Sequence, residues 1–76
     1  MNVLVYSKEN CAFCVRAKKL LEQNSIDYEE LIIGRDIDRD EFISMFPEVK
    51  TVPHIIIDNN TIGGFTQLEE WFKNGN

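Results

Sequence analysis

Two cysteines stand at the junction between a strand and a helix in the strand–helix–strand segment that opens the chain. Residues 3–7 are mainly apolar and predict a buried strand. Buried positions then recur at helical spacing from Cys14 to Leu21, which predicts a helix over residues 12–24. Residues 27–33 predict a second strand. Two strands joined through a helix lie parallel with a right-handed crossover, so this segment predicts an α/β fold.

A short helix and a hairpin follow this unit. Asp38 and Glu41 form an Asp-x-x-Glu cap for a short helix, which Pro47 ends. Residues 55–57 are three isoleucines, a β-branched run that predicts a strand covered on both faces. Residues 58–60 are aspartate and asparagine, which tolerate the positive φ of a tight turn, so the chain is expected to reverse there.

The chain returns in a strand at residues 61–62, and a last helix follows a pair of glycines. Thr66 and Glu69 form a Thr-x-x-Glu capping box for this helix. We therefore predict one domain over residues 1–76, in which three helices cover both faces of a mixed four-stranded sheet. The strands of this sheet are expected in the spatial order 27–33, 3–7, 55–57 and 61–62.

Size and composition restrict the partners of the chain. Its 76 residues are 43% hydrophobic, enough for one small core. No stretch approaches the roughly 20 apolar residues that a membrane span needs. Because Met1 leads directly into the first strand, we expect no secretory signal, no membrane attachment and a cytoplasmic location. The net charge of −5 gives no support for nucleic-acid binding.

Positive charge is concentrated around the cysteines. Between Lys8 and Lys19 the chain has four basic residues and one acidic residue, although it is acidic elsewhere. Two interpretations of Arg16, Lys18 and Lys19 stay open. They form a solvated helix face, or they stabilise a thiolate and attract an anionic thiol substrate.

Cys11 and Cys14 are the only cysteines of the chain, and their spacing allows a disulfide within one helical turn. In a cytosolic protein such a pair is more typical of redox or metal chemistry than of a structural disulfide. The helix N-terminus, and after it Lys8, should lower the pKa of Cys11 below the free-thiol value of about 8.5. Cys11 is thus expected to be the exposed, attacking thiol and Cys14 the resolving thiol, with Phe13 shielding the pair.

Other uses of the cysteines stay open at this stage. A zinc site would need two further ligands, and His54 is the only histidine, so no metal site is predicted. The cysteines would otherwise be inert core residues. His54 stands at the head of a buried strand, and we interpret it as structural or substrate-flanking rather than catalytic.

Two further segments have features of a binding site. If the Val52–Pro53 peptide bond is cis, the backbone of Val52 stays free to pair with an extended peptide, although local sequence alone favours a trans bond. Residues 64–67 open the last helix, whose N–H groups attract a carboxylate. A plain helix cap is the alternative interpretation of this second segment.

Together these motifs resemble the glutaredoxins of the thioredoxin fold, and the resemblance covers nearly the whole chain. The matching pieces are Val5-Tyr6-Ser7-Lys8, the run Cys-Ala-Phe-Cys-Val-Arg-Ala-Lys at 11–18, Thr51-Val52-Pro53, and Ile62-Gly63-Gly64-Phe65-Thr66. A C-x-x-C motif is weak evidence by itself. Its combination with Thr-Val-Pro and Gly-Gly, in this order and spacing, is specific.

The resemblance implies a thiol–disulfide oxidoreductase that reduces protein disulfides or glutathione mixed disulfides and is recharged by glutathione. Cys11 would be its catalytic nucleophile and Cys14 its resolving thiol. Pro53 would be a cis proline, and Val52 would pair with the cysteinyl backbone of glutathione. The other glutathione contacts would come from Lys8 and Phe13 at the glycyl end, from Phe65, Thr66 and Gln67 at the γ-glutamyl end, and from Thr51 and Gly64.

Family membership would also imply partners. Glutaredoxins commonly donate electrons to ribonucleotide reductase, and very short members occur in bacteria and phages. The resemblance therefore implies a monomer in the cytoplasm of a bacterium, or of the host if the chain is encoded by a phage.

The chain departs from the family pattern at three positions. Many members have proline at the position of Ala12 and tyrosine at the position of Phe13. Members without that proline can bridge a [2Fe–2S] cluster between two protomers with glutathione, which makes cluster binding an alternative function. An aspartate often stands at the position of Gln67, and the neutral glutamine should lower glutathione affinity. A redoxin recharged by thioredoxin reductase is therefore a second alternative.

Overall fold

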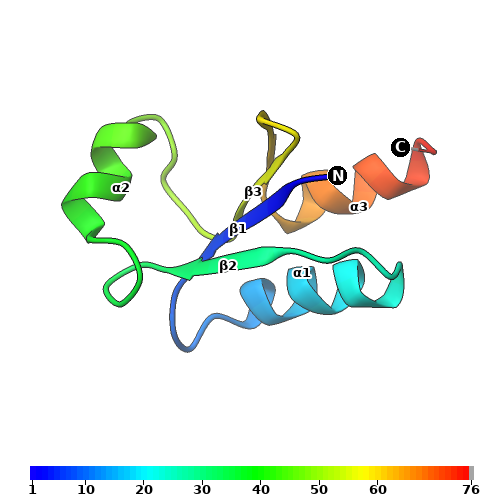
Figure 1. The fold of residues 1–76 in the computed structure, drawn as a ribbon, viewed down its shortest axis with the longest axis horizontal. Coiled ribbons are helices and arrows are strands. Elements are labelled where there is room, and N and C mark those ends of the chain that lie inside the picture. The colour runs from blue at the N-terminus through cyan, green and yellow to red at the C-terminus, as the bar shows by residue number, and fades with distance from the viewer. Residues whose placement is uncertain (76) are drawn as a thin grey trace.

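The computed structural model describes residues 1–75 of the chain. Its elements in chain order are β1 (Val3–Ser7), α1 (Ala12–Gln23), β2 (Glu29–Ile32), α2 (Arg39–Met45), β3 (His54–Ile57), β4 (Asn60–Gly63) and α3 (Phe65–Lys73). The strands form one sheet in the order β2-β1-β3-β4, as the sequence predicts. β1 lies at the centre of Figure 1, parallel to β2 and antiparallel to β3. The predicted thioredoxin-like topology is confirmed.

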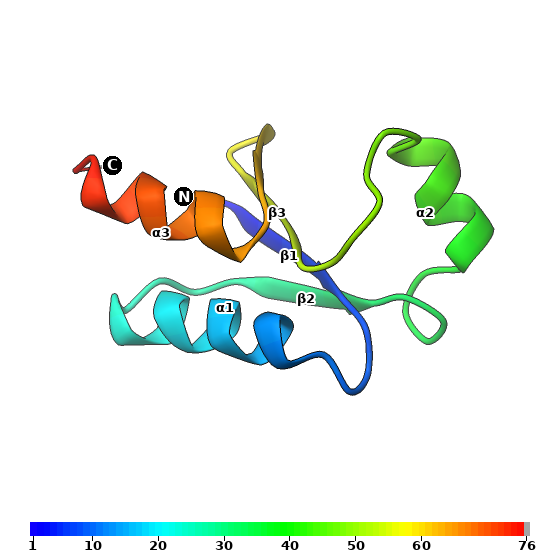
Figure 2. The same cartoon turned by 180° about the vertical axis from the view of Figure 1, so that it is seen from behind.

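One face of the sheet carries the apolar core. Side chains alternate along a strand, so the odd-numbered residues of β1 and β3 all point to this face. Helices α1 and α3 cover it and lie side by side in Figures 1 and 2. The buried residues of this core are Val3, Val5, Ala17, Leu21, Ile55, Ile57 and Leu68. The helical stripe predicted between Cys14 and Leu21 is therefore confirmed as the buried side of α1.

The opposite face carries a small aromatic cluster beneath α2, which stands apart from the other two helices in Figure 2. The ring of Tyr6 lies 5.2 Å from that of Phe42 and 5.3 Å from that of Phe46. The imidazole of His54 lies 4.7 Å from the Phe46 ring. This short helix covers only one end of the sheet, so Ile56 remains half-buried. The prediction that the isoleucine strand is covered on both faces is correct only at the end of β3 that lies beneath α2.

Two predicted caps differ in the structure. Asp38 does precede α2, but its side chain makes no capping hydrogen bond. Only Gly64 separates the end of β4 from the start of α3, so Gly64 is the N-cap and Thr66 already lies within the first turn. The side-chain oxygen of Gln67 accepts a hydrogen bond from the Gly64 N–H at 2.9 Å. The predicted Thr66–Glu69 capping box is therefore wrong, because the strand delivers the chain into the helix earlier than the motif suggests.

The ends of the strands differ slightly from the prediction. The turn between β3 and β4 has φ of 51° at Asp58 and 67° at Asn59, as its residue types predict. β2 is shorter than the predicted residues 27–33 at both ends, and Gly34, with φ of 93°, lies in the turn that follows it. No helix of the described residues is both long enough and apolar enough to cross a membrane.

The buried imidazole of His54 should make the stability of the fold depend on pH. It is 3% exposed, and its Nε2 has no hydrogen-bond partner among residues 1–75. Burial lowers the pKa of His54, so the unfolded chain binds this proton more tightly than the folded chain does. The free energy of unfolding should therefore be highest above the ordinary histidine pKa of about 6.5 and fall as the pH drops below it.

We expect denaturant unfolding to show this loss of stability between about pH 7 and pH 5.5, a window in which no other ordinary side chain titrates. His54→Leu should flatten the pH dependence in the same window, whatever its effect on absolute stability. An equally steep dependence in this variant would contradict the assignment to His54.

Candidate active site

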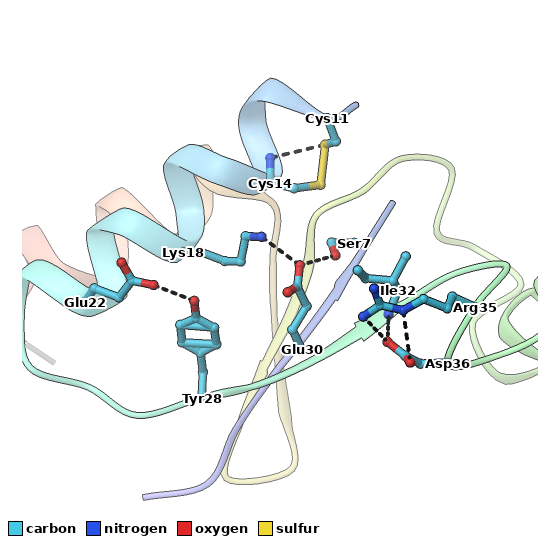
Figure 3. A network of polar contacts seen from close by, with 10 residues as sticks. All are labelled: Ser7, Cys11, Cys14, Lys18, Glu22, Tyr28, Glu30, Ile32, Arg35 and Asp36. Carbon is cyan, nitrogen blue, oxygen red and sulfur yellow. Dashed lines mark hydrogen bonds and ion pairs between the residues drawn. A yellow bond between two sulfur atoms is a disulfide. The ribbon is translucent and has the colours of Figure 1, made fainter. Parts of the chain in front are cut away.

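Cys11 and Cys14 are joined by a disulfide at the start of α1 (Figure 3). Their Cα atoms are 5.2 Å apart. Cys11 is the N-cap of the helix, with extended backbone, and its Sγ accepts a hydrogen bond from the Cys14 backbone N–H at 3.1 Å. Cys14 is 1% exposed, whereas Cys11 is partly exposed. The outer and inner positions predicted for the two sulfurs are therefore confirmed.

The loop before β3 approaches the outer sulfur from a distant part of the sequence. The Val52–Pro53 peptide bond is cis, which agrees with the family resemblance rather than with the general preference for trans bonds. The carbonyl oxygen of Val52 lies 3.9 Å from the Cys11 Sγ. Because a disulfide sulfur carries no hydrogen, this distance is a packing contact and not a hydrogen bond. The N–H of Val52 makes no hydrogen bond within the part of the chain that the structure describes.

A first groove of about 340 Å³ begins beside this loop. The chain segments around it come from the start of α1, the loop before β3 and the start of α3. It brings together almost all the residues that the sequence assigns to substrate binding. Its lining residues are Phe13, Thr51, Val52, Pro53, Gly64, Phe65, Thr66 and Gln67. We call this the proline groove.

Two aromatic rings, both in contact with an arginine side chain, form one wall of the proline groove. The rings of Phe13 and Phe65 have their centres 6.0 Å apart. The guanidinium carbon of Arg16 lies 5.3 Å from the Phe13 centroid and 4.8 Å from the Phe65 centroid. Both distances are within the range of cation–π attraction. Phe13 is still 53% exposed, so it presents an open apolar surface beside the disulfide.

A second groove, of about 620 Å³, lies between the disulfide and β2. Both cysteines line it, together with Lys8, Lys18 and Glu30. Lys8 is therefore the one predicted substrate-binding residue that does not line the proline groove. We call this second depression the lysine groove.

An ion pair crosses the lysine groove from α1 to β2 (Figure 3). The Lys18 Nζ lies 2.8 Å from Glu30 Oε2, and the Ser7 hydroxyl donates to the same oxygen at 2.6 Å. Partial burial raises the pKa of the Glu30 carboxyl, but the hydrogen bonds from Lys18 and Ser7 outweigh it and leave this pKa below its usual value. Glu30 is thus a carboxylate at neutral pH.

The basic residues of α1 differ in their surroundings. Arg16 contacts aromatic rings and Lys18 is paired with a carboxylate, so neither is simply a solvated side chain. Lys19 is exposed. Neither Ser7 nor Glu30 carries a local sequence signal that marks it as a site residue. A serine that ends one strand and a glutamate within its parallel neighbour form a pair that only the strand register reveals.

The site offers little to a metal ion. Residues 1–75 contain no group of three or more histidine, cysteine, aspartate or glutamate side chains that could hold one. His54 lies in the aromatic cluster beneath α2. What the arrangement does provide is an accessible sulfur at a helix N-terminus, a second sulfur directly behind it, and an extended groove beside the first. These are the requirements of thiol–disulfide exchange.

Comparison with known proteins agrees with this geometry. The sequence profile of the Glutaredoxin family matches residues 3–62. The chain is 43% identical over 68 residues to glutaredoxin 3 of Escherichia coli K12, a match that covers 88% of this chain and 81% of that protein. It is 35% identical over 75 residues to glutaredoxin 1 of Rickettsia conorii, covering 96% of this chain and 74% of that protein.

A solved structure of a buckwheat glutaredoxin–glutathione complex is also similar. Its TM-score to this chain is 0.82 at 28% identity, with 96% of this chain and 69% of that chain covered. The chain belongs to the glutaredoxin family. Membership of this family, together with the Cys11–Cys14 pair, implies thiol–disulfide oxidoreductase activity.

A side chain at Gly63, the last residue of β4, should lower the stability of the fold. Gly63 has φ of 119°, and a Cβ added there would lie 3.0 Å from Gln67 Cγ. Gly34 has φ of 93° but nothing within 4 Å of an added Cβ, so it is a matched control. Both alanine variants should lose about 1–2 kcal/mol of stability through the backbone. Gly63→Ala should lose about 1 kcal/mol more through the clash with Gln67. Equal losses in denaturant unfolding would contradict the close packing at this corner of the proline groove.

Proposed function

We propose that this glutaredoxin reduces glutathione mixed disulfides and protein disulfides with electrons from glutathione. The observation that carries the proposal is the proline groove, because it places an extended binding surface directly beside the accessible sulfur of Cys11. Its dimensions and its mixture of apolar and backbone surfaces fit a tripeptide whose central residue is cysteine.

The backbone of the groove supports an extended orientation for glutathione. The free N–H and the carbonyl of Val52 would pair with the backbone of the cysteinyl residue, as a short form of strand addition. The start of α3 would receive the γ-glutamyl carboxylate, because its N–H groups and the helix dipole attract an anion. Thr66 and Gln67 lie in the first turn of that helix, and Phe65 and Phe13 form the apolar wall.

The neutral side chain of Gln67 distinguishes this site. Its oxygen already accepts the Gly64 N–H, so it caps α3 rather than presenting a carboxylate to an amine. Lys8 lines the lysine groove together with Cys11 and does not line the proline groove. It would favour the thiolate more directly than it would bind the glycyl end.

The reaction is a sequence of sulfur exchanges. The Cys11 thiolate attacks a substrate disulfide, its new bond forms as the substrate bond breaks, and one substrate sulfur leaves as a thiolate that takes up a proton. With a protein substrate, Cys14 then attacks the Cys11 sulfur and releases the second substrate thiol, leaving the internal disulfide. Two molecules of glutathione reduce this disulfide and leave as glutathione disulfide.

Substitution of the two cysteines tests the assignment of roles. Cys11→Ser should reduce glutathione-coupled turnover of a small glutathione mixed disulfide to the uncatalysed rate, because the nucleophile is lost. Cys14→Ser should keep turnover of this substrate, which needs only one thiol, but should lose turnover of a protein disulfide. Equal activity in wild type and Cys11→Ser would rule out the proposed nucleophile.

The same assay identifies the electron source. Turnover supported by thioredoxin reductase but not by glutathione would favour the alternative in which this chain is recharged as a thioredoxin-like protein. The motivation for that alternative is the presence of Gln67 and Ala12 at positions where many glutaredoxins have aspartate and proline.

The thiol pKa is a separate prediction. Reduced protein should react with iodoacetamide at Cys11 with an inflection below the free-thiol pKa of about 8.5, because this sulfur lies at the helix N-terminus and the Cys14 N–H points at it. Lys8→Met should raise the inflection by about half a unit, a smaller effect than that of the helix. An inflection at the free-thiol value in wild type would show that neither the helix nor Lys8 acts on Cys11.

We propose further that the protein acts in the cytoplasm as a monomer and that ribonucleotide reductase is among its electron acceptors, in keeping with the family resemblance. The cluster-binding alternative rests on Ala12, the first residue of α1. It would use Cys11 from two copies of the chain, because Cys14 is buried. Colourless, iron-free protein after anaerobic reconstitution with glutathione would contradict that alternative.

A further inference from the structure

We propose that Lys18, held in place by Glu30, is a positioning residue that favours the thiolate of the resolving cysteine, Cys14. The inference rests on the proposed function, in which Cys14 attacks the mixed disulfide at Cys11. It concerns only that second step, because the first step uses the outer sulfur alone.

The position of Lys18 follows from the helix. Cys14 and Lys18 are four residues apart on α1, so their side chains lie on the same face, one turn apart. Both residues line the lysine groove. In Figure 3 the Lys18 side chain extends along α1 in the direction of the disulfide. Its ammonium group is paired with the carboxylate of Glu30, a residue of β2.

A buried serine of β1 holds the Lys18–Glu30 ion pair in place. Ser7 is completely buried and donates its hydroxyl hydrogen to the Glu30 oxygen that also receives Lys18. The side chains of Lys18 and Glu30 are each 25% exposed, which is low for two charged groups of this length. Three elements, β1, α1 and β2, therefore hold the ammonium group in one place, and a freely solvated lysine would not have this order.

The thiolates of Cys11 and Cys14 are stabilised by different groups. Cys11 is at the N-cap and already receives a backbone N–H at 3.1 Å. Cys14 is inside the helix and 1% exposed, so burial opposes its ionisation. A nearby ammonium group offsets that cost, and Lys18 is the basic residue of α1 that lines the same groove as Cys14.

The charge balance of the groove makes the direction of the effect unambiguous. Its charged lining residues are Lys8, Glu9, Lys18 and Glu30, two of each sign. Loss of Lys18 removes a positive charge and leaves the negative charge of Glu30 paired only with the Ser7 hydroxyl. The groove then becomes more negative, which disfavours the Cys14 thiolate. Arg35, in the turn after β2, also acts electrostatically on the Glu30 carboxylate, and His54 packs among the aromatic rings beneath α2.

The chemical step is balanced within the site. Cys14 loses its proton to solvent, and the thiolate attacks the Cys11 sulfur of the mixed disulfide. The bond between Cys11 and the substrate sulfur breaks as the bond between Cys14 and Cys11 forms. The substrate sulfur leaves with the bonding electron pair as a thiolate and recovers a proton from solvent. The two protein thiols are thus oxidised and the substrate disulfide is reduced to two thiols.

A symmetric nitrophenyl disulfide separates the two steps, because each releases one coloured aromatic thiolate. In stopped-flow measurements on the reduced protein, the first phase reports attack by Cys11 and the second reports attack by Cys14. We expect Lys18→Met to slow the second phase about threefold to tenfold at pH 7 and to raise its pH midpoint by about half to one unit. The first phase should change less, and Lys18→Arg should restore the second phase.

Lys19→Met is the matched control, since it removes the same charge from the next, exposed residue of α1. It should leave the second phase unchanged. A Lys18→Met midpoint equal to that of wild type, or an equal shift in Lys19→Met, would overturn the inference. Cys14→Ser distinguishes this failure from failure of the proposed function: its second phase should vanish, and a persisting second phase would refute the role of Cys14 itself.

Discussion

The antiparallel pairing of β1 with β3 brings together the two chain segments that meet at the Cys11 sulfur. Tyr6 stands opposite His54, so the loop that follows β1 and the loop that precedes β3 emerge at the same end of the two central strands. The first loop leads to Cys11 and the second contains Val52, whose carbonyl oxygen lies 3.9 Å from the sulfur. A shift of one residue in this pairing would turn every side chain of one strand to the opposite face. Core packing and the site therefore depend on the same register.

The walls of the proline groove depend on the core beneath them. Phe13 belongs to α1 and Phe65 to α3, and these helices meet because Leu21 and Leu68 are both completely buried against the sheet. Burial of such a side chain contributes about 1.5–3 kcal/mol, whereas the cation–π contact of Arg16 contributes about 0.5–1 kcal/mol at an exposed site. The core packing thus determines the width of the groove, and Arg16 only orients the Phe13 and Phe65 rings at its wall.

Elements with a local signal could be predicted well. The stripe on α1, the positive φ of the turn at Asp58, and the order of the strands all follow from residue periodicity, turn chemistry or crossover rules. The cap of α3 could not, because Thr-x-x-Glu is a plausible local signal that the end of β4 overrides. Glu30 was missed for a related reason. Its partner Ser7 is 23 residues away, and only strand pairing brings the two together.

The sequence by itself determined the two sulfurs, their spacing and the helix that places one outside and the other inside, because these are properties of a single turn of chain. The tertiary structure decided what surrounds them. The Val52 backbone, the Phe13–Phe65 wall and the Lys18–Glu30 pair each join segments that are far apart in sequence, or packed from different elements. Such contacts depend on the register of the sheet and on the packing of helices over it, which no local pattern encodes.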